Sequence, residues 1–204
     1  VIAFIGILAA FFLTCVSLAK GSAHLPKDQG REFAVGGALS AGKPRGAGLI
    51  FVLVFAITSV LFAHVDPEMI IYLLLLICCM MTGYLDDVAK TSWGRLKKGI
   101  LDFRVALLVT FTYLHFNGNP ITLALTGSSF SIPAPVFAVL SIALIWISIN
   151  VTNCADGVDG LSGTLTIITI MTFYFANQIL GRTGDFDYLS LLFVVCLLGY
   201  LWFN

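Results

Sequence analysis

A chain of 204 residues in which 59% are hydrophobic and only 11% are charged has too little polar surface for a soluble domain. Soluble domains carry roughly 25% charged residues, so lipid is the expected solvent here. The 11 basic and 11 acidic side chains balance. That balance excludes a generally basic surface for nucleic acid, and no nucleic-acid partner is expected.

Continuous apolar runs, close to the roughly 17–25 residues that cross a bilayer, predict seven membrane-spanning helices. They cover residues 1–19, 48–63, 69–85, 99–116, 132–149, 161–180 and 189–203. The runs lack the alternation of barrel strands, and only helices or closed barrels satisfy backbone groups in lipid. A secretory signal peptide is the alternative for the first run, but no basic segment precedes it. The predicted fold is an all-α, polytopic transmembrane bundle, a single integral membrane domain over residues 1–204.

Lysine and arginine residues sort onto one side of this predicted bundle. The connections after the first and third spans hold almost all of them: Lys20, Lys27, Arg31, Lys43, Arg45, Lys90, Arg95, Lys97 and Lys98. Arg182 lies on the other side, and Arg104 falls just inside the fourth span. The positive-inside rule therefore places the odd-numbered connections in the cytoplasm and the amino terminus outside.

The first polar motif along the chain is a basic, glycine-rich turn, Gly-Lys-Pro-Arg-Gly-Ala-Gly, at residues 42–48. No Lys-Ser/Thr pair closes it, so it is not a Walker A loop. Amides at a helix start, together with Lys43 and Arg45, can hold phosphate, which makes Lys43 a candidate substrate-binding residue. The basic flank of any membrane helix looks much the same, so this motif alone is weak.

Two adjacent carboxylates, Asp86 and Asp87, follow the third apolar run. Neighbours on a helix point about 100° apart, so the two side chains cannot share one task. We expect one to face a polar cavity while Asp86 pairs with Lys90, the residue four positions on. Adjacent anions at a low-dielectric edge need cations or a metal. A helix cap explains one aspartate but not two, so Asp86, Asp87 and Lys90 are the candidate catalytic residues.

The second acidic motif reads Asn-x-x-Asp-Gly-x-Asp-Gly-Leu and covers residues 153–161. Its polar members, spaced by three, would line one side of a helical turn: Asn153, Asp156 and Asp159. Glycines at 157, 160 and 163 leave room for a ligand or another helix. The alternative is that Asp159 caps the sixth span and the glycines pack helices, which leaves the other two residues unexplained.

The remaining acids and the placement of the motifs separate an enzyme from a transporter. Acids in the short connections on the opposite side are expected to be solvated turn residues: Asp66, Glu68, Asp185 and Asp187. All three polar motifs fall in connections predicted to be cytoplasmic, and we place no charge at the middle of a span. Transporters commonly carry ionisable groups at mid-membrane depth, so an interfacial enzyme is favoured.

At these motifs the chain resembles the polyprenyl-phosphate N-acetylhexosamine-1-phosphate transferases, which carry the aspartate pair and the Asn-x-x-Asp-Gly-x-Asp-Gly-Leu loop in this order. Within that superfamily it is most similar to the bacterial phospho-N-acetylmuramoyl-pentapeptide transferases, on residues 25–33 and the turn at 42–48. The commoner family turn is Thr-Pro-Thr-Met-Gly-Gly, so contacts there do not carry over closely. The family continues into further spans, so the resemblance implies that residues 1–204 are an amino-terminal portion and that the metal-ligating aspartate lies beyond Asn204.

The resemblance implies a multi-pass enzyme of the bacterial cell membrane with a cytoplasmic active site and Mg2+ as cofactor. It would transfer phospho-MurNAc-pentapeptide from UDP-MurNAc-pentapeptide to undecaprenyl phosphate within membrane lipid, giving lipid I and UMP. Asp87 would orient or deprotonate the lipid phosphate, and Asp86 would organise Lys90 and the metal shell. Asn153 and Asp156 would line the cleft, with Asp159 on the uridine side. Direct attack by the lipid phosphate is preferred, and a two-step route through an aspartate nucleophile stays open.

Two alternatives stay open at this stage. One is a related UDP-GlcNAc:polyprenyl-phosphate GlcNAc-1-phosphate transferase. The other, from a different class, is a non-catalytic membrane scaffold or transporter. The sequence leaves the choice between a monomer and a homodimer open.

Overall fold

The computed structural model describes residues 1–27, 42, 44–89, 93–123, 126–155 and 159–203. These residues form seven α-helices: α1 (Ile2–Gly21), α2 (Gly48–Phe62), α3 (Pro67–Val88), α4 (Arg95–Asn117), α5 (Ala134–Ala155), α6 (Leu161–Ile179) and α7 (Asp185–Leu201). A 3-10 turn, η1 (Ser22–His24), follows α1. Each of the seven predicted spans corresponds to one helix, so the all-α bundle is confirmed.

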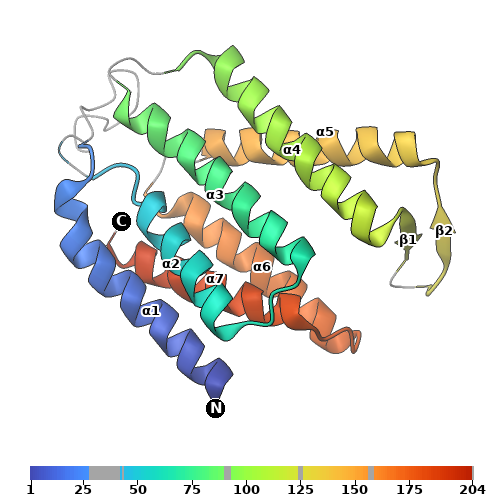
Figure 1. Cartoon of the computed structure of the whole chain (residues 1–204), viewed down its shortest axis with the longest axis horizontal. Coiled ribbons are helices and arrows are strands. Elements are labelled where there is room, and N and C mark those ends of the chain that lie inside the picture. Colours follow the sequence, from blue (N-terminus) through green and yellow to red (C-terminus); the bar gives the residue numbers. More distant parts are fainter. Residues whose placement is uncertain (28–41, 43, 90–92, 124–125, 156–158, 204) are drawn as a thin grey trace.

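Each helix packs against the next one along the chain, and α7 returns to pack against α1 and α2. The ends of α1, α3, α5 and α7 and the starts of α2, α4 and α6 gather toward the left and top of Figure 1. We call this region the aspartate end, and define it by its described residues: 20–27, 44–49, 84–89, 93–99, 150–155 and 159–163. Up-and-down packing of consecutive helices is what brings these distant segments to one end.

The buried core lies among α1, α2, α3 and α7. It comprises Ala10, Phe55, Leu73, Leu189, Leu192 and Cys196. Small residues let the helices approach closely: a Cβ added to Gly199 of α7 would lie 3.0 Å from Thr14 Cγ2 of α1. The Thr14 hydroxyl donates to the carbonyl of Ala10 at 2.8 Å, so no polar group is left unpaired at this contact. Small residues at helix contacts are typical of membrane bundles, where apolar burial alone does not drive association.

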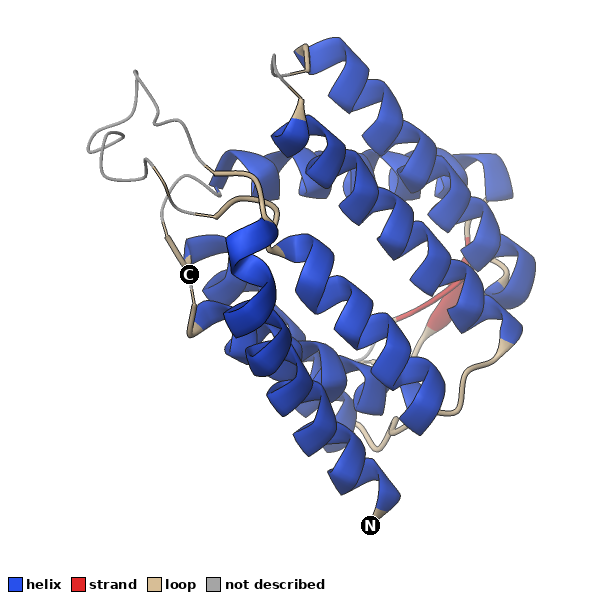
Figure 2. Cartoon of the chain, turned by 60° about the vertical axis from the view of Figure 1, so that its left-hand side comes forward, coloured by secondary structure: helices blue, strands red, loops and turns tan. Residues whose placement is uncertain are grey.

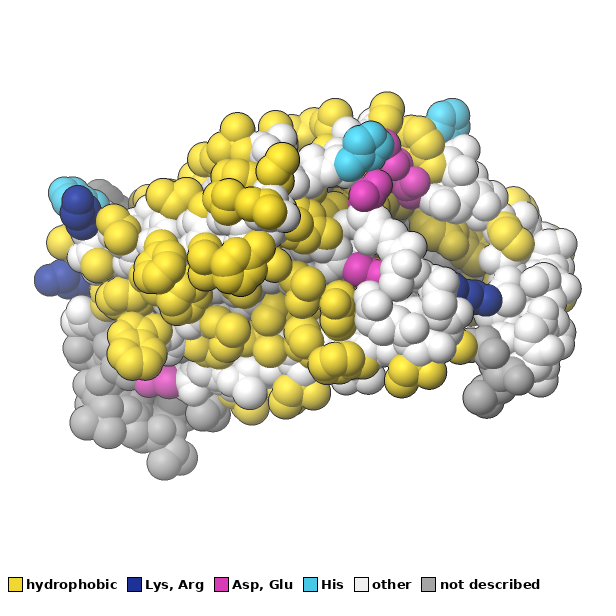
Figure 3. Space-filling model, turned by 90° about the horizontal axis from the view of Figure 1, so that it is seen from below, with side chains coloured by type: hydrophobic (Ala, Val, Ile, Leu, Met, Phe, Trp, Pro, Cys, Tyr) yellow, Lys and Arg dark blue, Asp and Glu magenta, His cyan; other side chains and the backbone are white. Residues whose placement is uncertain are grey.

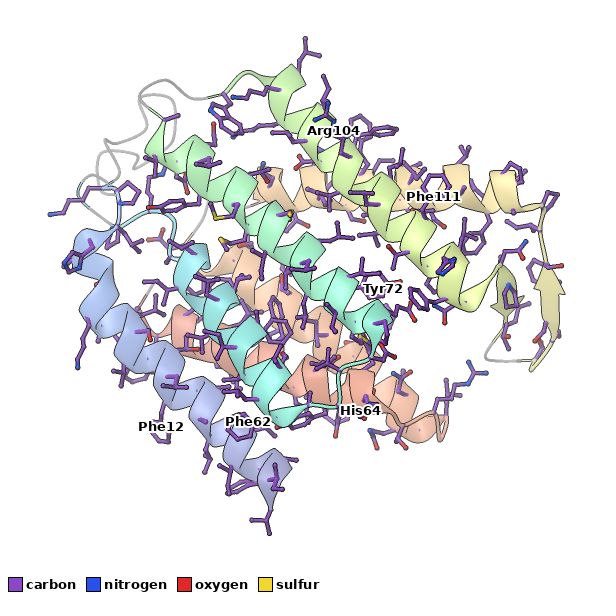
Figure 4. All side chains as sticks on the ribbon, viewed as in Figure 1. Phe12, Phe62, His64, Tyr72, Arg104 and Phe111 are labelled. Atoms are coloured by element: carbon purple, nitrogen blue, oxygen red, sulfur yellow. The ribbon has the colours of Figure 1, made fainter. Side chains whose placement is uncertain are left out.

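The exterior of the bundle is apolar. Phe12 of α1 and Phe111 of α4 project outward in Figure 4, with 60% and 55% of each residue exposed. Hydrophobic side chains dominate the face in Figure 3, with Lys and Arg toward its ends. Within the described residues, four segments are long and apolar enough to cross a membrane: Ile2–His24, Pro67–Val88, Leu96–Asn117 and Ala134–Asn153. This is the surface of a membrane protein.

Acidic residues at the opposite end fix helix termini. The Asp66 side chain accepts from the Met69 amide at 2.8 Å and caps α3, while Glu68 accepts from the Tyr72 hydroxyl (Figure 4). Asp187 is only 6% exposed and accepts from the Asn177 side chain at 3.0 Å. The expectation of a solvated turn residue is wrong for Asp187, because its carboxylate is buried and hydrogen-bonded in the first turn of α7.

A β-hairpin joins α4 to α5, with β1 (Pro120–Thr122) antiparallel to β2 (Ser129–Ser131) and Ile121 opposite Phe130. It lies on the far side of the molecule from the junction of α1 and α2 (Figures 1 and 2). The hairpin was not predicted, because strands of three residues are too short to show a period of two.

Candidate functional site

Asp86 lies in the last turn of α3, and both of its carboxylate oxygens are bound. Lys98 Nζ lies 2.5 Å from Oδ2, and the Trp93 backbone N–H donates to Oδ1 at 2.6 Å. The Asp86 side chain is 9% exposed. Its partners lie just before and inside the first turn of α4, so Asp86 ties the end of α3 to the start of α4. A carboxylate held in this way is poorly placed to receive a substrate.

The expected pairing of Asp86 with Lys90 rested on a helix that runs through both residues. The helix instead ends at Val88, and Ala89 has an extended backbone with φ −63° and ψ 135°. The helix on which this pairing rested therefore ends too early, and the described cation bound to Asp86 is Lys98. Lys90 itself lies outside the described residues, so its own role stays a prediction.

Asp87 has a different environment from its neighbour. Arg45 Nη2 lies 2.9 Å from Asp87 Oδ1, with side-chain exposures of 41% and 25%. The Asp87 carboxylate therefore reaches the surface of the aspartate end, whereas Asp86 is covered by α4. Neighbouring helical residues differ in direction by about 100°, which produces these two environments from one dipeptide.

The turn that carries Arg45 is held by backbone contacts on both sides. The Arg45 amide donates to the Pro26 carbonyl at 2.7 Å, next to an antiparallel bridge between Lys27 and Pro44. Gly46 follows with φ +74°, and a Cβ there would lie 2.9 Å from Tyr84 Cδ2 of α3. The basic turn thus packs directly on the last turns of α3. Lys43, the predicted substrate-binding residue of this turn, lies outside the described residues.

The second acidic motif spans two helices. Asn153 lies in the last turn of α5 and lines a cavity of about 440 Å³ with Ser148, Ile149, Thr152 and Ser162. This volume is within the range of roughly 300–1,000 Å³ that small-molecule sites occupy. Asp159 is exposed and precedes α6, and Asp156 lies outside the described residues. The spacing of Asn153 and Asp159 had suggested that they share one helical turn. They do not, because Asn153 lies in α5 and Asp159 precedes α6.

The start of α6 bears on the alternative interpretation of this motif. Gly160, with φ +73°, occupies the N-cap position of α6, and Asp159 lies one residue before it. Gly160 and Gly163 make room for α7. A Cβ added to Gly163 would lie 2.9 Å from Leu201 Cδ2, and one added to Gly160 would lie 3.5 Å from the same atom. At these two glycines the neighbour is another helix.

Two contributors to this end, Lys98 and Asp102, were not predicted as site residues, and Arg45 was predicted to hold phosphate and not to pair with Asp87. Nothing local in the sequence links Arg45 or Lys98 to its aspartate. Asp102 was not weighed, although it is only 8% exposed and interacts electrostatically with Lys98, one turn earlier on α4. The i, i+4 spacing of these two residues was the signal available.

Whether the two acidic motifs share one cleft stays a prediction. Helix α5 is fixed to α4 at this end, because the Trp146 side chain donates to the Gly99 carbonyl at 2.9 Å. Among the described residues, however, the lining of the cavity at Asn153 comes from α5 and α6. Asp156 lies outside the described residues. The prediction that one cleft is bordered by Asp86, Asp87, Asn153, Asp156 and Asp159 is therefore not tested.

The described side chains do not form a magnesium site by themselves. Within the described part of the chain, no group of three or more His, Cys, Asp or Glu side chains could hold a metal ion. Asp86 is bound to Lys98, and Asp87 is bound to Arg45. The expectation of Mg2+ thus continues to rest on the resemblance.

The fold and this end define an all-α membrane bundle with paired carboxylates and cations where its helices emerge. Residues 69–204 match the sequence family described as Glycosyl transferase family 4, and the chain belongs to that family.

Individual relatives agree with this assignment. The phospho-N-acetylmuramoyl-pentapeptide-transferase of Treponema pallidum (strain Nichols) is 38% identical over an alignment that covers 98% of this chain and 60% of that protein. The protein of the same name from Symbiobacterium thermophilum is 29% identical, with 80% and 53% covered. The one from Picosynechococcus is 34% identical, with 60% and 35% covered. This chain thus spans 60% of the length of the Treponema protein, and the expected resemblance is confirmed.

Proposed function

We propose that the protein carrying this chain is a phospho-N-acetylmuramoyl-pentapeptide transferase. It transfers phospho-MurNAc-pentapeptide from UDP-MurNAc-pentapeptide to undecaprenyl phosphate, and its products are lipid I and UMP. Support comes from the name shared by its relatives, one of them 38% identical over nearly the whole chain. Support also comes from the environment of Asp87.

The observation that carries the proposal is the division between the two aspartates. Asp86 is covered and bound on both oxygens, whereas Asp87 is 25% exposed beside a guanidinium at the surface. A capping or purely structural pair would not need one exposed member. An exposed carboxylate next to a cation, where a membrane helix ends, suits a reaction between a lipid phosphate and a water-soluble donor.

The chemistry is a displacement at phosphorus. An oxygen of undecaprenyl phosphate attacks the phosphorus that carries the sugar, and a new diphosphate bond forms. The bond from that phosphorus to the bridging oxygen breaks, and UMP leaves with the oxygen and its electron pair. A phosphate monoester has a second pKa of about 6, so the acceptor is mostly dianionic near neutral pH. Asp87 then orients the acceptor phosphate and accepts its remaining proton where one is present.

The proposal also includes the side of the membrane and the cofactor. The aspartate end faces the cytoplasm, in keeping with the basic residues of its connections and with a soluble nucleotide donor. Mg2+ supplies the concentrated positive charge that phosphoryl transfers generally use, and we assign none of the described side chains to it.

The test is turnover by the full-length protein in detergent with undecaprenyl phosphate and Mg2+. With UDP-MurNAc-pentapeptide we expect release of UMP together with a lipid-linked product. With UDP-GlcNAc in its place we expect no turnover. Turnover with UDP-GlcNAc alone would instead assign the protein to the GlcNAc-1-phosphate transferases. Turnover with neither donor would favour a scaffold or transporter.

A further inference from the structure

The ion pair between Arg45 and Asp87 joins two motifs that lie far apart in the sequence. Arg45 precedes α2, Asp87 lies in the last turn of α3, and the two helices pack against each other. The Nη2–Oδ1 distance is 2.9 Å. Charge-assisted bonds of this length are among the stronger polar contacts in proteins, and an arginine fixes direction as well as charge.

The position of Arg45 is set by its backbone. The Arg45 amide is bonded to the Pro26 carbonyl at 2.7 Å. On the other side, Gly46 abuts Tyr84, and a Cβ at Gly46 would lie 3.8 Å from Asp87 Oδ2. The turn therefore packs against α3 at the residue that it pairs with. An arginine on a loosely attached loop would lack this constraint.

Two ion pairs at this end join the adjacent aspartates to basic residues of other segments. Lys98 is paired with Asp86, and Arg45 is paired with Asp87. Loss of Arg45 would remove a positive charge 2.9 Å from the Asp87 carboxylate. Asp87 lies beside Asp86 and meets a phosphate dianion in the proposed reaction, and both of these anions repel it.

We propose that Arg45 is a positioning residue, which holds the Asp87 carboxylate in the direction of the acceptor phosphate. The inference rests on the transfer proposed above. The commoner turn of the resembling family has threonine where this chain has Arg45, so the role is argued from this chain's own ion pair.

The test uses steady-state kinetics of the full-length protein. Arg45→Gln should lower kcat by roughly 10- to 100-fold, the range that a misplaced catalytic group produces. KM for undecaprenyl phosphate and for the donor should change little, because Arg45 acts through Asp87. Arg45→Lys, which keeps the charge without the planar fork, should have an intermediate kcat. The matched control is Lys20→Gln, an exposed lysine at the same end, with wild-type kinetics expected.

A double-mutant cycle separates positioning from a general structural role. Arg45→Gln added to Asp87→Asn should cause little further loss of the residual activity, because the partner of Arg45 is already altered. An equal loss in both backgrounds would overturn the inference. A raised KM at unchanged kcat, or wild-type kinetics for Arg45→Gln, would overturn it too. If Arg45→Gln does not accumulate as folded protein, Arg45→Lys takes its place in the cycle with the same two outcomes.

Failure of this inference is distinct from failure of the proposed function. Wild-type turnover with unaffected Arg45 variants removes the inference alone. Wild-type turnover with UDP-GlcNAc alone removes the proposed donor, and the cycle is then run with that donor. A wild-type protein that uses neither donor ends both proposals.

Discussion

Lys98 Nζ of α4 lies 2.5 Å from Asp86 Oδ2 of α3. This contact, with the Trp93 amide on the other oxygen, clamps the connection between the two helices. It also distinguishes the two members of the aspartate pair. Asp86 serves the structure of the aspartate end, and the proposed function assigns the chemistry to Asp87.

The first prediction concerns Asp87. In the full-length protein, Asp87→Asn should lower turnover by roughly 10²–10⁴-fold, the usual cost of losing a positioned acid or base. Its thermal midpoint should stay near wild type, because the side chain is partly exposed. The measurement is UMP release, with thermal unfolding in detergent as the check on folding. Asp86→Asn is the matched comparison and should lower the midpoint clearly. Retention of more than about a tenth of turnover by Asp87→Asn would contradict its role.

The second prediction concerns the ion pair between Lys98 and Asp86. Lys98→Met should reduce the free energy of unfolding by about 1–3 kcal/mol, because Asp86 keeps its Trp93 bond but loses its cation. The lower part of that range is expected, since the Lys98 side chain is 36% exposed and water screens the pair.

Thermal unfolding in detergent measures this effect, and Lys20→Met is the control. Lys20 is also basic and exposed at the aspartate end, and no ion pair to Lys20 is present within the described residues. Equal midpoints for the two variants would show that the ion pair between Lys98 and Asp86 does not stabilise the fold.

The third prediction concerns metal removal. The described cations nearest the aspartate pair, Arg45 and Lys98, are already matched to carboxylates. They therefore leave little net charge to offset a donor diphosphate and an acceptor phosphate. Chelation with EDTA should abolish UMP release, and added Mg2+ should restore it. A thermal midpoint that EDTA leaves unchanged would separate loss of chemistry from loss of fold. Full turnover in EDTA would remove Mg2+ from the proposal.

Much of the fold was predictable, because a continuous apolar run in lipid must form a helix to satisfy its backbone hydrogen bonds. Each of the seven runs became a helix, and α5 exceeded its predicted end only because the polar residues after 149 continue the helix to Ala155. Hydropathy marks where lipid ends, and the hydrogen-bonded helix can extend past that point. The same difference placed Asn153 on a helix that was expected to have ended already.

The candidate site was predictable in its residues but not in its pairings. Asp86 and Asp87 stood out from sequence, yet their partners Lys98 and Arg45 come from other segments. Helical spacing predicted Lys90 as the partner of Asp86, and the extended Ala89 removes the basis for that geometry. Partners brought together by tertiary packing leave no periodic signal in one sequence.

The last prediction concerns Gly46, which follows Arg45 and lies two residues before the start of α2. Its φ of +74° is left-handed, and a Cβ there would lie 2.9 Å from the Tyr84 ring. Gly46→Ala should therefore cost roughly 1–2 kcal/mol for the backbone conformation alone. In addition, the new methyl group must push the turn away from α3, which pulls Arg45 from Asp87 and lowers kcat.

Gly42→Ala separates these two effects. Gly42 also has a left-handed φ, of +86°, but no atom of the described residues lies within 4 Å of a Cβ added there. Both variants should lose stability to backbone strain, measured by thermal unfolding, because both adopt the same left-handed region. Gly46→Ala should lose more in total, because its methyl group also meets the Tyr84 ring. Gly46→Ala alone should lose turnover, by a factor close to that of Arg45→Gln, and should add little to that variant. If Gly42→Ala and Gly46→Ala lose turnover equally, backbone strain alone accounts for the effect, and the contact of the turn with α3 does not position Arg45.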